Sequence, residues 1–428
     1  MFKKNNYALG LVWMIAVGLL PTPFLYSFFI GTPGLTGSSR IGIGFGIIAY
    51  VWMLLAIYIG TKPKWLDRLI GLPAAYMLHG ILSSVAIVLA FMHKNLSPSY
   101  GLVALTGNIA FILFLSLALY SMIFMAGWLT SRIPLLAKLK RQLEIVFKHE
   151  ISIWLHRLNL IATFLIFIHV QLIGYIRENL AFMAIFYFTS LFVFASYILA
   201  KCKPTAAGFS AKLVSNTEVG PNIYELRIKV PVHRSKQMRP GDFIFISFPG
   251  IKGLTEPHPF SIVNDPRGAS ELILAIRGDG DFTRQLQSVQ TPTTIAVDGG
   301  YGMYQSVIDD QAPKQLLAIS GGIGVTPILS VIEGNPHIHT TVFHGASTDA
   351  ALIYGERFAK WQAERDNLIV NRVVGMYQAE DVLRYLPEDK KDFTVLISGP
   401  AAMARYWVKV LVKQGVPKSQ IFYEEFGW

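Results

Sequence analysis

The chain contains a single cysteine, Cys202. One thiol excludes an intramolecular disulfide and any iron–sulfur cluster held by cysteines, so redox chemistry would have to use other groups. Charge is also scarce: Asp, Glu, Lys and Arg make up 15% of the 428 residues, with 27 acidic against 38 basic side chains. The basic residues of the first half cluster at the ends of apolar runs, which is typical of membrane topology. No nucleic-acid partner is therefore expected, despite the net charge of +11.

Apolar residues are abundant, at 52% of the chain, and they gather in the first 200 positions. Six apolar runs are long enough to cross a bilayer. The prolines at 21 and 23 are expected to end or kink the first run. The six predicted spans are Tyr7–Ile30, Ile41–Ile59, Leu72–Met92, Leu102–Trp128, Ile153–Gly174 and Leu180–Ala200.

Basic flanking residues predict the orientation of these spans. One set of flanks carries twelve Lys and Arg and the other three, and the richer set faces the cytoplasm. Both termini and the whole C-terminal half are thus predicted to be cytoplasmic, in a multi-pass protein of the plasma membrane with short outward loops. The richer set is Lys3, Lys4, Lys62, Lys64, Arg68, Arg132, Lys138, Lys140, Arg141, Lys148, Lys201 and Lys203, and the other is Arg40, Lys94 and Arg177.

Four histidines stand in or near two of the spans. His79 and His93 are 14 residues apart on the third span, about 21 Å along a helix, and His156 and His169 are 13 apart on the fifth, about 20 Å. Both spans run outward, so the first members pair at one depth and the second members at another. This arrangement suits two stacked bis-histidine haems, with these four residues as the iron ligands.

Two points stay open at this stage. Intramembrane histidines also serve as hydrogen-bonding partners between helices. In addition, 14 residues return nearly to the same helix face but 13 do not, so the fifth span is distorted or the haems approach it from different sides. His149 lacks a partner 14 residues further on and is read as an interfacial histidine.

From about Lys212 the pattern becomes strand-like, as in Tyr224–Val230 and Asp242–Ser247, broken by Pro and Gly turns. An antiparallel barrel of about 100 residues is expected there. Three segments within it have glycines for close approach to phosphate and side chains that donate to its oxygens. They are His258-Pro-Phe-Ser261, Arg277-Gly-Asp-Gly-Asp-Phe-Thr283 and Asp298-Gly-Gly-Tyr-Gly302.

A buried-type strand, Gln315–Ser320, is followed by Gly321-Gly-Ile-Gly-Val-Thr-Pro327 and a helical run. Strand, glycine turn and helix together present a helix N-terminus to a pyrophosphate, although the full dinucleotide fingerprint is absent. Further strands are expected at 340–343, 368–370 and 394–397. The segment therefore indicates an α/β nucleotide-binding domain.

The order of these motifs resembles the ferredoxin–NADP reductase superfamily over residues 206–428. With the six spans and four histidines, the whole chain resembles the ferric reductase and NADPH oxidase family, most of all its compact bacterial members. The resemblance implies FAD on the first two motifs and a nicotinamide dinucleotide on the glycine loop and the Ser398-Gly-Pro turn. The implied cofactor-binding residues are His258, Pro259, Phe260, Ser261, Arg277, Gly280, Thr283, Gly302, Gly321, Gly322, Gly324, Thr326, Pro327, Gly399 and Pro400.

The resemblance also implies roles near the C-terminus. Glu424 and Phe426 match the family's terminal E-x-F, in which the aromatic ring covers the flavin, although Trp428 offers a larger ring. Ser398 stands where the family usually has cysteine, and the family's D-G-P-Y-G reads Asp298-Gly-Gly-Tyr-Gly. The predicted catalytic residues are Ser398, Glu425, Phe426 and Trp428.

The residues that would set the coenzyme preference point to both NADH and NADPH. Asp349 favours the free 2′-hydroxyl of NADH but lies later than the usual offset, whereas Ser347 and Arg372 suit the 2′-phosphate of NADPH. NADPH is preferred here, with NADH as the alternative.

The complete expectation is a six-helix transmembrane haem bundle (1–205), an antiparallel β-barrel that binds FAD (206–308) and a Rossmann-like α/β NAD(P)-binding domain (309–428). Electrons would pass from NADPH through FAD and two b-type haems to external O2, giving superoxide, or to a ferric or cupric chelate. Competing readings are a transporter with a nucleotide-sensing domain and a haem subunit for a separate reductase. No obligate protein partner is expected.

Overall fold

The computed structural model describes residues 6–35, 37–124, 135, 138, 154–202 and 208–424. The chain divides into two compact units. One unit comprises residues 7–63, 73–202 and 427–428, and the other comprises 1–6, 64–72 and 203–426. The boundary expected near 205 is thus close to the division, except that residues 64–72, from within the first half, group with the second.

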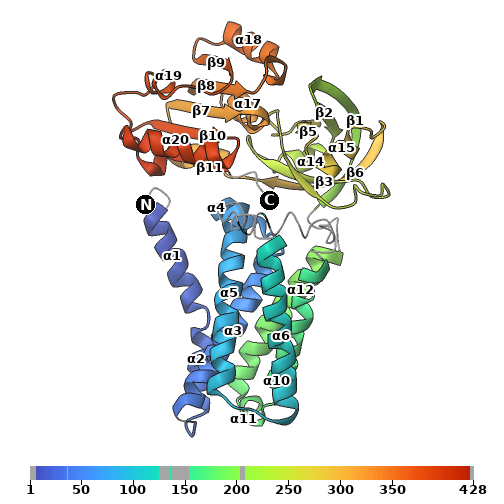
Figure 1. Cartoon of the computed structure of the whole chain (residues 1–428), viewed down its shortest axis with the longest axis vertical. Coiled ribbons are helices and arrows are strands. Elements are labelled where there is room, and N and C mark those ends of the chain that lie inside the picture. Colours follow the sequence, from blue (N-terminus) through green and yellow to red (C-terminus); the bar gives the residue numbers. More distant parts are fainter. Residues whose placement is uncertain are drawn as a thin grey trace. The chain divides into compact units, whose positions relative to one another are not determined.

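The helical unit contains long apolar helices that Figure 1 shows as a bundle. By length and composition, five stretches of the described residues are able to cross a membrane, so the expected count of six is not confirmed. The helices are α1 (Asn6–Leu19), α2 (Thr22–Gly31), α3 (Gly37–Ile59), α5 (Leu72–Leu96), α6 (Gly101–Phe124), α10 (Asn159–Gln171), α11 (Gly174–Arg177) and α12 (Leu180–Cys202).

The first span is broken where the prolines stand. Helix α1 ends at Leu19 and α2 begins at Thr22, with Pro23 in its first turn. Proline lacks the backbone N–H that a helix interior needs, and its ring clashes with the preceding turn. The kink predicted from Pro21 and Pro23 is confirmed.

The expected span Ile153–Gly174 is the one that falls short. Helix α10 has 13 residues, about 20 Å, against a hydrocarbon core of about 30 Å. Residues 154–156 are helical, but a turn follows in which Arg157 and Leu158 donate their N–H groups to the carbonyls three residues back. This tighter turn lies between His156 and His169, so the structure shows the first of the two explanations left open for their 13-residue spacing, a distorted span.

Aromatic and aliphatic side chains hold the helical unit together. Phe24, Phe28 and Phe186 form part of one buried cluster that joins α2, α3 and α12. Within it the hydroxyl groups of Tyr50 and Ser190 lie 2.8 Å apart. A buried hydroxyl without a partner would be costly in apolar surroundings, so this pair fixes α3 against α12.

The second unit begins with a six-stranded antiparallel sheet in the order β4-β3-β6-β1-β2-β5. Its edge strands meet through one bridge, Ile262 to Leu274, supported by a 2.8 Å hydrogen bond from Val263 N to Ile273 O. The antiparallel character is confirmed, whereas barrel closure is limited to this contact. The strands are β1 (Gly208–Gly220), β2 (Ile223–Lys229), β3 (Phe243–Ser247), β4 (His258–Ser261), β5 (Glu271–Arg277) and β6 (Thr293–Tyr301), with helices α4 (Lys64–Ile70), α14 (Val232–Ser235) and α15 (Asp281–Leu286).

A five-stranded parallel sheet follows, in the order β11-β10-β7-β8-β9. Buried residues of α17 and α18 pack on one face, and those of α19 and α20 on the other. The strand order reverses between β7 and β10, and ligands of such folds bind at the carboxyl ends beside that reversal. The elements are α16 (Tyr304–Gln311), β7 (Gln315–Gly321), η2 (Gly322–Gly324), α17 (Val325–Gly334), β8 (His339–Ala346), η3 (Asp349–Ala351), α18 (Gly355–Glu364), β9 (Leu368–Val374), α19 (Ala379–Leu383), β10 (Phe393–Ser398), α20 (Ala401–Lys413), η4 (Lys418–Gln420) and β11 (Ile421–Glu424).

Candidate functional site

The four histidines predicted as haem ligands come together as two pairs. The ring centroids of His79 and His156 lie 5.8 Å apart, and those of His93 and His169 lie 6.3 Å apart. A metal between two imidazoles, with bonds of about 2 Å and roughly 1.1 Å from nitrogen to ring centre on each side, separates the centroids by about 6 Å. The pairing deduced from the sequence is therefore the pairing in the structure.

Each ring is oriented through Nδ1. His79 Nδ1 lies 2.8 Å from the Ala56 carbonyl and His93 Nδ1 lies 2.9 Å from the Gly42 carbonyl. His169 Nδ1 lies 2.9 Å from the Val103 carbonyl, and His156 Nδ1 lies 3.0 Å from Oγ of Ser121. Since a carbonyl only accepts, Nδ1 carries the proton in the first three, which leaves Nε2 as a free donor of electrons. Metal-bound histidines are commonly held in this way.

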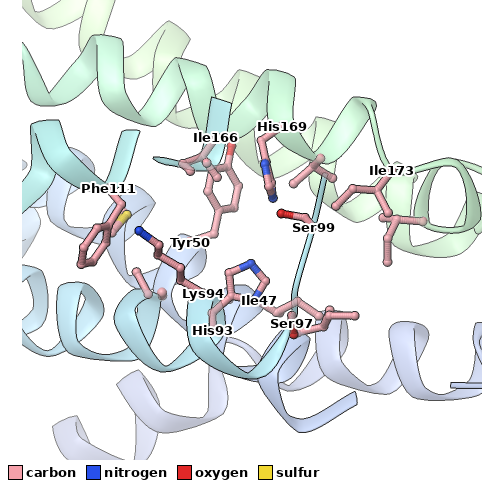
Figure 2. A pocket seen from close by; sticks show the side chains of 18 of the residues that line it. Ile47, Tyr50, His93, Lys94, Ser97, Ser99, Phe111, Ile166, His169 and Ile173 are labelled. Carbon is pink, nitrogen blue, oxygen red and sulfur yellow. The ribbon is translucent and has the colours of Figure 1, made fainter. Parts of the chain in front are cut away.

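Glycines make room beside the outer pair. A Cβ at Gly46 would lie 2.9 Å from Nδ1 of His93, and one at Gly107 would lie 3.1 Å from Cε1 of His169. A cavity of about 130 Å³, lined mostly by apolar side chains, opens between these two histidines. Figure 2 shows the two rings facing each other from separate helices. Ser99 and Lys94 also line the cavity, and the ammonium group of Lys94 lies 5.4 Å from the centroid of the Phe111 ring.

Metal sites built from three or more protein ligands, as for zinc, need a cluster of His, Cys, Asp or Glu side chains. Within the described ranges there is no group of three or more His, Cys, Asp or Glu side chains placed to hold a metal ion. A bis-histidine site needs only two protein ligands, so the paired histidines are not affected by that finding.

The first two flavin motifs lie together in the antiparallel unit. The ring of His258, on β4, stands 4.0 Å from that of Phe282, on α15, and the ring of Phe260 stands 6.1 Å from Phe282. Thr283 caps the turn before α15, because its Oγ1 accepts a 2.9 Å hydrogen bond from Gly280 N. The sequence-predicted groups of this motif are thus assembled, with the Thr283 hydroxyl engaged locally.

Arg277 links the flavin motifs to the glycine loop. It ends β5, is half exposed, and forms an ion pair with Asp279 at 2.6 Å. Its Nη1 lies only 3.8 Å from where a Cβ of Gly322 would stand. A guanidinium in this place reaches phosphate groups on either side of the junction.

The glycine loop depends on the absence of side chains. A Cβ at Gly324 would lie 2.4 Å from the carbonyl oxygen of Ser398, and Gly322 has a φ of +55°. The loop after β7 and the Ser398-Gly-Pro turn after β10 therefore touch backbone to backbone. The backbones of Gly321 and Gly399 also lie close together, since a Cβ at Gly399 would stand 3.1 Å from Gly321 N.

His344 is hydrogen-bonded to the glycine loop. The sequence analysis did not identify it as a site residue. It is fully buried at the end of β8, and its Nε2 lies 3.1 Å from the Gly322 carbonyl, which fixes Nε2 as the protonated nitrogen. Nδ1 is buried without a hydrogen-bond partner. Burial lowers the pKa of His344 to about 4, so the ring is neutral at pH 7.

Two further predicted site residues, Arg372 and Gly302, already make hydrogen bonds within the protein. Arg372, on β9, donates to the Leu352 carbonyl, so its guanidinium is already partly engaged. Gly302 uses both backbone groups on helix α4, through Asp67 and Arg68. Glu425, Phe426 and Trp428, together with His149, lie outside the described residues.

Glu424 is a further group whose setting only the fold reveals. Its carboxyl group is buried, and Oε1 accepts a 2.6 Å hydrogen bond from Met303 N. Burial, more than the nearby Asp67 and Asp242, raises the pKa of Glu424 to about 8, against the opposing effect of Arg68. The residue was placed in the tail motif by resemblance, but a burial of this kind has no sequence signature.

Residues 209–404 match a family model described as an FAD-binding domain. Two curated relatives are electron transfer subunits of dihydroorotate dehydrogenase B. The probable one of Methanocaldococcus jannaschii is 26% identical over 44% of this chain and 68% of its own length, and that of Listeria innocua is 26% identical over 49% and 80%. A terephthalate 1,2-dioxygenase reductase component of Comamonas is 26% identical over 36% and 46%.

Among solved structures, the ferredoxin NADP+ reductase of Neisseria gonorrhoeae with bound FAD and NADP is 18% identical to this chain. The match covers 52% of this chain and 99% of the reductase, with a TM-score of 0.44. The sequence relatives are oxidoreductases, and together with the family match they support a flavin-dependent, NAD(P)H-driven reductase domain.

His344→Phe should weaken coenzyme binding. The variant leaves the buried Gly322 carbonyl without its hydrogen-bond donor, which costs about 1–3 kcal/mol. If that cost falls on the loop conformation that binds the coenzyme, KM for NAD(P)H should rise about ten-fold. Flavin content should stay constant, and His344→Gln, which keeps a donor, should restore most of the affinity. His337→Phe, at an exposed position of the same domain, is the matched control. An unchanged KM in His344→Phe would show that the loop does not depend on this contact.

Glu424→Gln should flatten the pH dependence of stability. Because the folded-state pKa of Glu424, about 8, lies above the ordinary glutamate value of 4.5, the folded chain binds an extra proton between those two pH values. Stability therefore falls as pH rises through that window. We expect the temperature of flavin release to drop from pH 6 to 8.5 in the wild type and less in Glu424→Gln, with exposed Glu218→Gln as control. Parallel profiles for wild type and Glu424→Gln would contradict this assignment.

Proposed function

We propose that this chain uses its FAD-binding domain of ferredoxin–NADP reductase type to pass electrons from cytoplasmic NADPH across the membrane, through two histidine-held haems, to external O2. The FAD-binding domain occupies residues 209–404. The observation that carries the proposal is the pair of facing imidazoles at each of two positions, His79 with His156 and His93 with His169.

The residues present suit haem in three respects. The centroid separations match two imidazoles on one iron, each Nδ1 is tied to a backbone carbonyl or a hydroxyl, and Gly46 and Gly107 leave space beside the rings. An imidazole that merely joined two helices would be expected to hydrogen-bond its neighbour. Here the bonds to neighbouring helices engage only Nδ1 of His79, His93 and His169, while the two rings of each pair face each other, which favours a ligand shared through Nε2.

Bound FAD would supply the exchange of a two-electron hydride for single electrons, which haem iron takes one at a time. The residues of the chain itself position the two cofactors. Gly321–Gly324 and the Ser398-Gly-Pro turn keep their backbones together so that a dinucleotide can lie over the reversal between β7 and β10. Arg277 supplies the positive charge at the junction of the two cofactors, and His258, Phe260 and Phe282 supply the ring surfaces.

The coenzyme and the tail belong to the same proposal. NADPH rather than NADH is favoured by Ser347 and Arg372, although Arg372 already donates to the Leu352 carbonyl and would have to turn to meet a 2′-phosphate. Phe426, or Trp428 in its place, would cover the flavin and leave when the nicotinamide arrives. Ser398 would stand beside the nicotinamide where relatives of this type usually have a cysteine.

The choice between O2 and a ferric chelate rests on the short connections α2–α3 and α5–α6, residues 32–36 and 97–100, on the side predicted to face outward. They leave little protein to build a chelate site, which favours O2 as the acceptor. Lys94, next to His93 in the sequence, adds one positive charge to the lining of the cavity at the outer pair, with its ammonium group 5.4 Å from the centroid of the Phe111 ring (Figure 2). A ferric or cupric chelate reductase, which would use the same electron path, is therefore the second candidate.

Removing either member of a histidine pair should remove one haem and leave the other. His79→Leu and His156→Leu should each lower the count from two haems per chain to one, and so should His93→Leu and His169→Leu, because one axial ligand alone holds b-type haem weakly. Pyridine haemochrome analysis gives the count. His233→Leu, at an exposed position of the soluble unit, should keep two haems. A wild-type chain with one haem or none would defeat the proposal.

The acceptor can be separated with a variant of Lys94. With saturating NADPH, the wild type should consume O2 and form superoxide faster than it reduces ferric citrate under argon. If an anionic chelate is the natural acceptor, Lys94→Met should raise the KM for ferric citrate several-fold, because the positive charge beside the His93–His169 pair no longer attracts the anion. A ferric citrate kcat/KM above that for O2, lost in Lys94→Met, would favour the reductase over the oxidase.

A further inference from the structure

Helix α17 runs from the glycine loop to the flavin sheet, which comprises strands β1–β6 and the loops that join them. Helix and sheet lie in the same compact unit. The helix follows Gly324 directly and ends at Gly334. Side chains near its end, Ser330 and Glu333, bond to the flavin sheet and not only to the parallel sheet that α17 covers.

Ser330 makes two of these bonds, although its side chain is fully buried. Its Oγ donates to the Asn264 carbonyl at 2.7 Å and accepts from Gly241 N at 3.0 Å. If the helix shifted by about 1 Å, the buried N–H of Gly241 and the Asn264 carbonyl would both lose this partner, which is costly. One hydroxyl group therefore fixes α17 against two separate loops of the flavin sheet.

Glu333 adds a second attachment almost one turn later. Its Oε2 accepts from Asp265 N at 2.8 Å and from Nη2 of Arg357 at 2.6 Å. Arg357 lies on α18, so its positive charge neutralises the carboxylate while the same oxygen holds the flavin sheet. In the opposite direction Arg267, which is paired with Asp265, donates to the Gly334 carbonyl. The end of α17 is thus bound through both a donor and an acceptor of one short loop.

That loop, residues 262–270, joins the two strands that carry flavin motifs. Strand β4 ends at Ser261, and β5 begins at Glu271. The side chain of Asn264 closes the loop, because Oδ1 accepts from Ile273 N at 2.8 Å and Nδ2 donates to the Glu271 carbonyl at 3.0 Å. One helix therefore starts at the glycine loop and ends on the connection between the flavin-motif strands.

We infer that Ser330 and Glu333 are positioning residues for hydride transfer from the coenzyme to the flavin. In that step the C4–H bond of the nicotinamide breaks, and the hydride bonds to N5 of the flavin with both electrons. NADPH is thereby oxidised to NADP+, and the flavin is reduced by two electrons. The inference rests on the proposed function for this first step alone, which precedes any haem.

The distance between the two cofactors is what these contacts would set. Reacting atoms must come within about 3–3.5 Å of each other, and a misplacement of about 1 Å can cost roughly 100-fold in rate. Ser330 and Glu333 follow Gly324 by about 9 Å and about 14 Å along the helix axis. A change at either side chain should therefore alter the separation of the cofactors more than the affinity for either one.

The test uses the full-length chain in detergent without O2, and follows the first turnover by the loss of NADPH absorbance in a stopped-flow instrument. In Ser330→Ala and Glu333→Ala, the rate constant should fall at least ten-fold, while flavin content and the Kd for NADP+ stay within about two-fold. With deuterium at C4 of NADPH, the isotope effect should rise. Glu333→Gln keeps an acceptor for Asp265 N and should restore a rate within about two-fold of the wild type.

Asn335→Ala is the matched control for a loss of stability. Asn335 is buried, and its Nδ2 donates to Oε1 of Gln305 and to the Val331 carbonyl, both at 2.8 Å, so these bonds lie outside the flavin sheet. This variant should lower the temperature of unfolding as Ser330→Ala does. The rate constant and the isotope effect should stay at their wild-type values.

Hydrogen exchange gives a readout that does not depend on activity. The Gly241 amide should lose protection in Ser330→Ala, and the Asp265 amide in Glu333→Ala, because each loses its acceptor. If Ser330→Ala does not fold, the comparison of Glu333→Ala with Glu333→Gln decides alone. The inference is overturned if both alanine variants keep the wild-type rate, or if Asn335→Ala slows hydride transfer as much as they do.

Failure of the proposed function would be seen in a different measurement. A wild-type chain without haem would defeat that proposal. The first turnover of NADPH would still take place at the flavin, and the rates of the Ser330 and Glu333 variants would still decide on this inference.

Discussion

The cost of placing a polar group in apolar surroundings governs the helical unit. An imidazole buried among apolar helices needs partners for both ring nitrogens, and these are supplied unequally here. Nδ1 of His79, His93 and His169 reaches the carbonyls of Ala56, Gly42 and Val103. Nε2 is left to face the opposite ring. The residues that fix the histidines therefore come from neighbouring helices, and the packing of those helices is part of the site.

The same constraint acts in the soluble unit, with charges in place of imidazoles. Asp242 and Glu424 are buried carboxyl groups, and each is held by hydrogen bonds at a junction of elements. Arg68, carried on α4, neutralises Asp242. A helix that the sequence presents as a membrane flank is thus needed to complete the flavin domain, which explains why residues 64–72 group with that unit.

The chemistry of the nucleotide site depends on backbone proximity more than on side chains. Gly324 permits the loop after β7 to touch Ser398, and Gly322 adopts a positive φ beside Arg277. These glycines were identified from the order strand, glycine turn and helix. The buried His344, which holds the Gly322 carbonyl, has no such pattern, because a single histidine after a strand looks like any other.

The sequence by itself determined where the apolar helices lie and which histidines pair. Hydropathy located the helices, proline predicted the break between α1 and α2, and spacings of 14 and 13 residues predicted both histidine pairs. The 13-residue spacing left two explanations open, and the tighter turn at Arg157 shows that the span is distorted. These features follow from local periodicity. Only the tertiary structure decided that the fifth expected span is a 13-residue helix, that barrel closure rests on one bridge, and that Asp67 and Arg68 serve the flavin domain. Such features depend on contacts between residues far apart in the chain, where a charged side chain carries no sign of which distant partner it will meet.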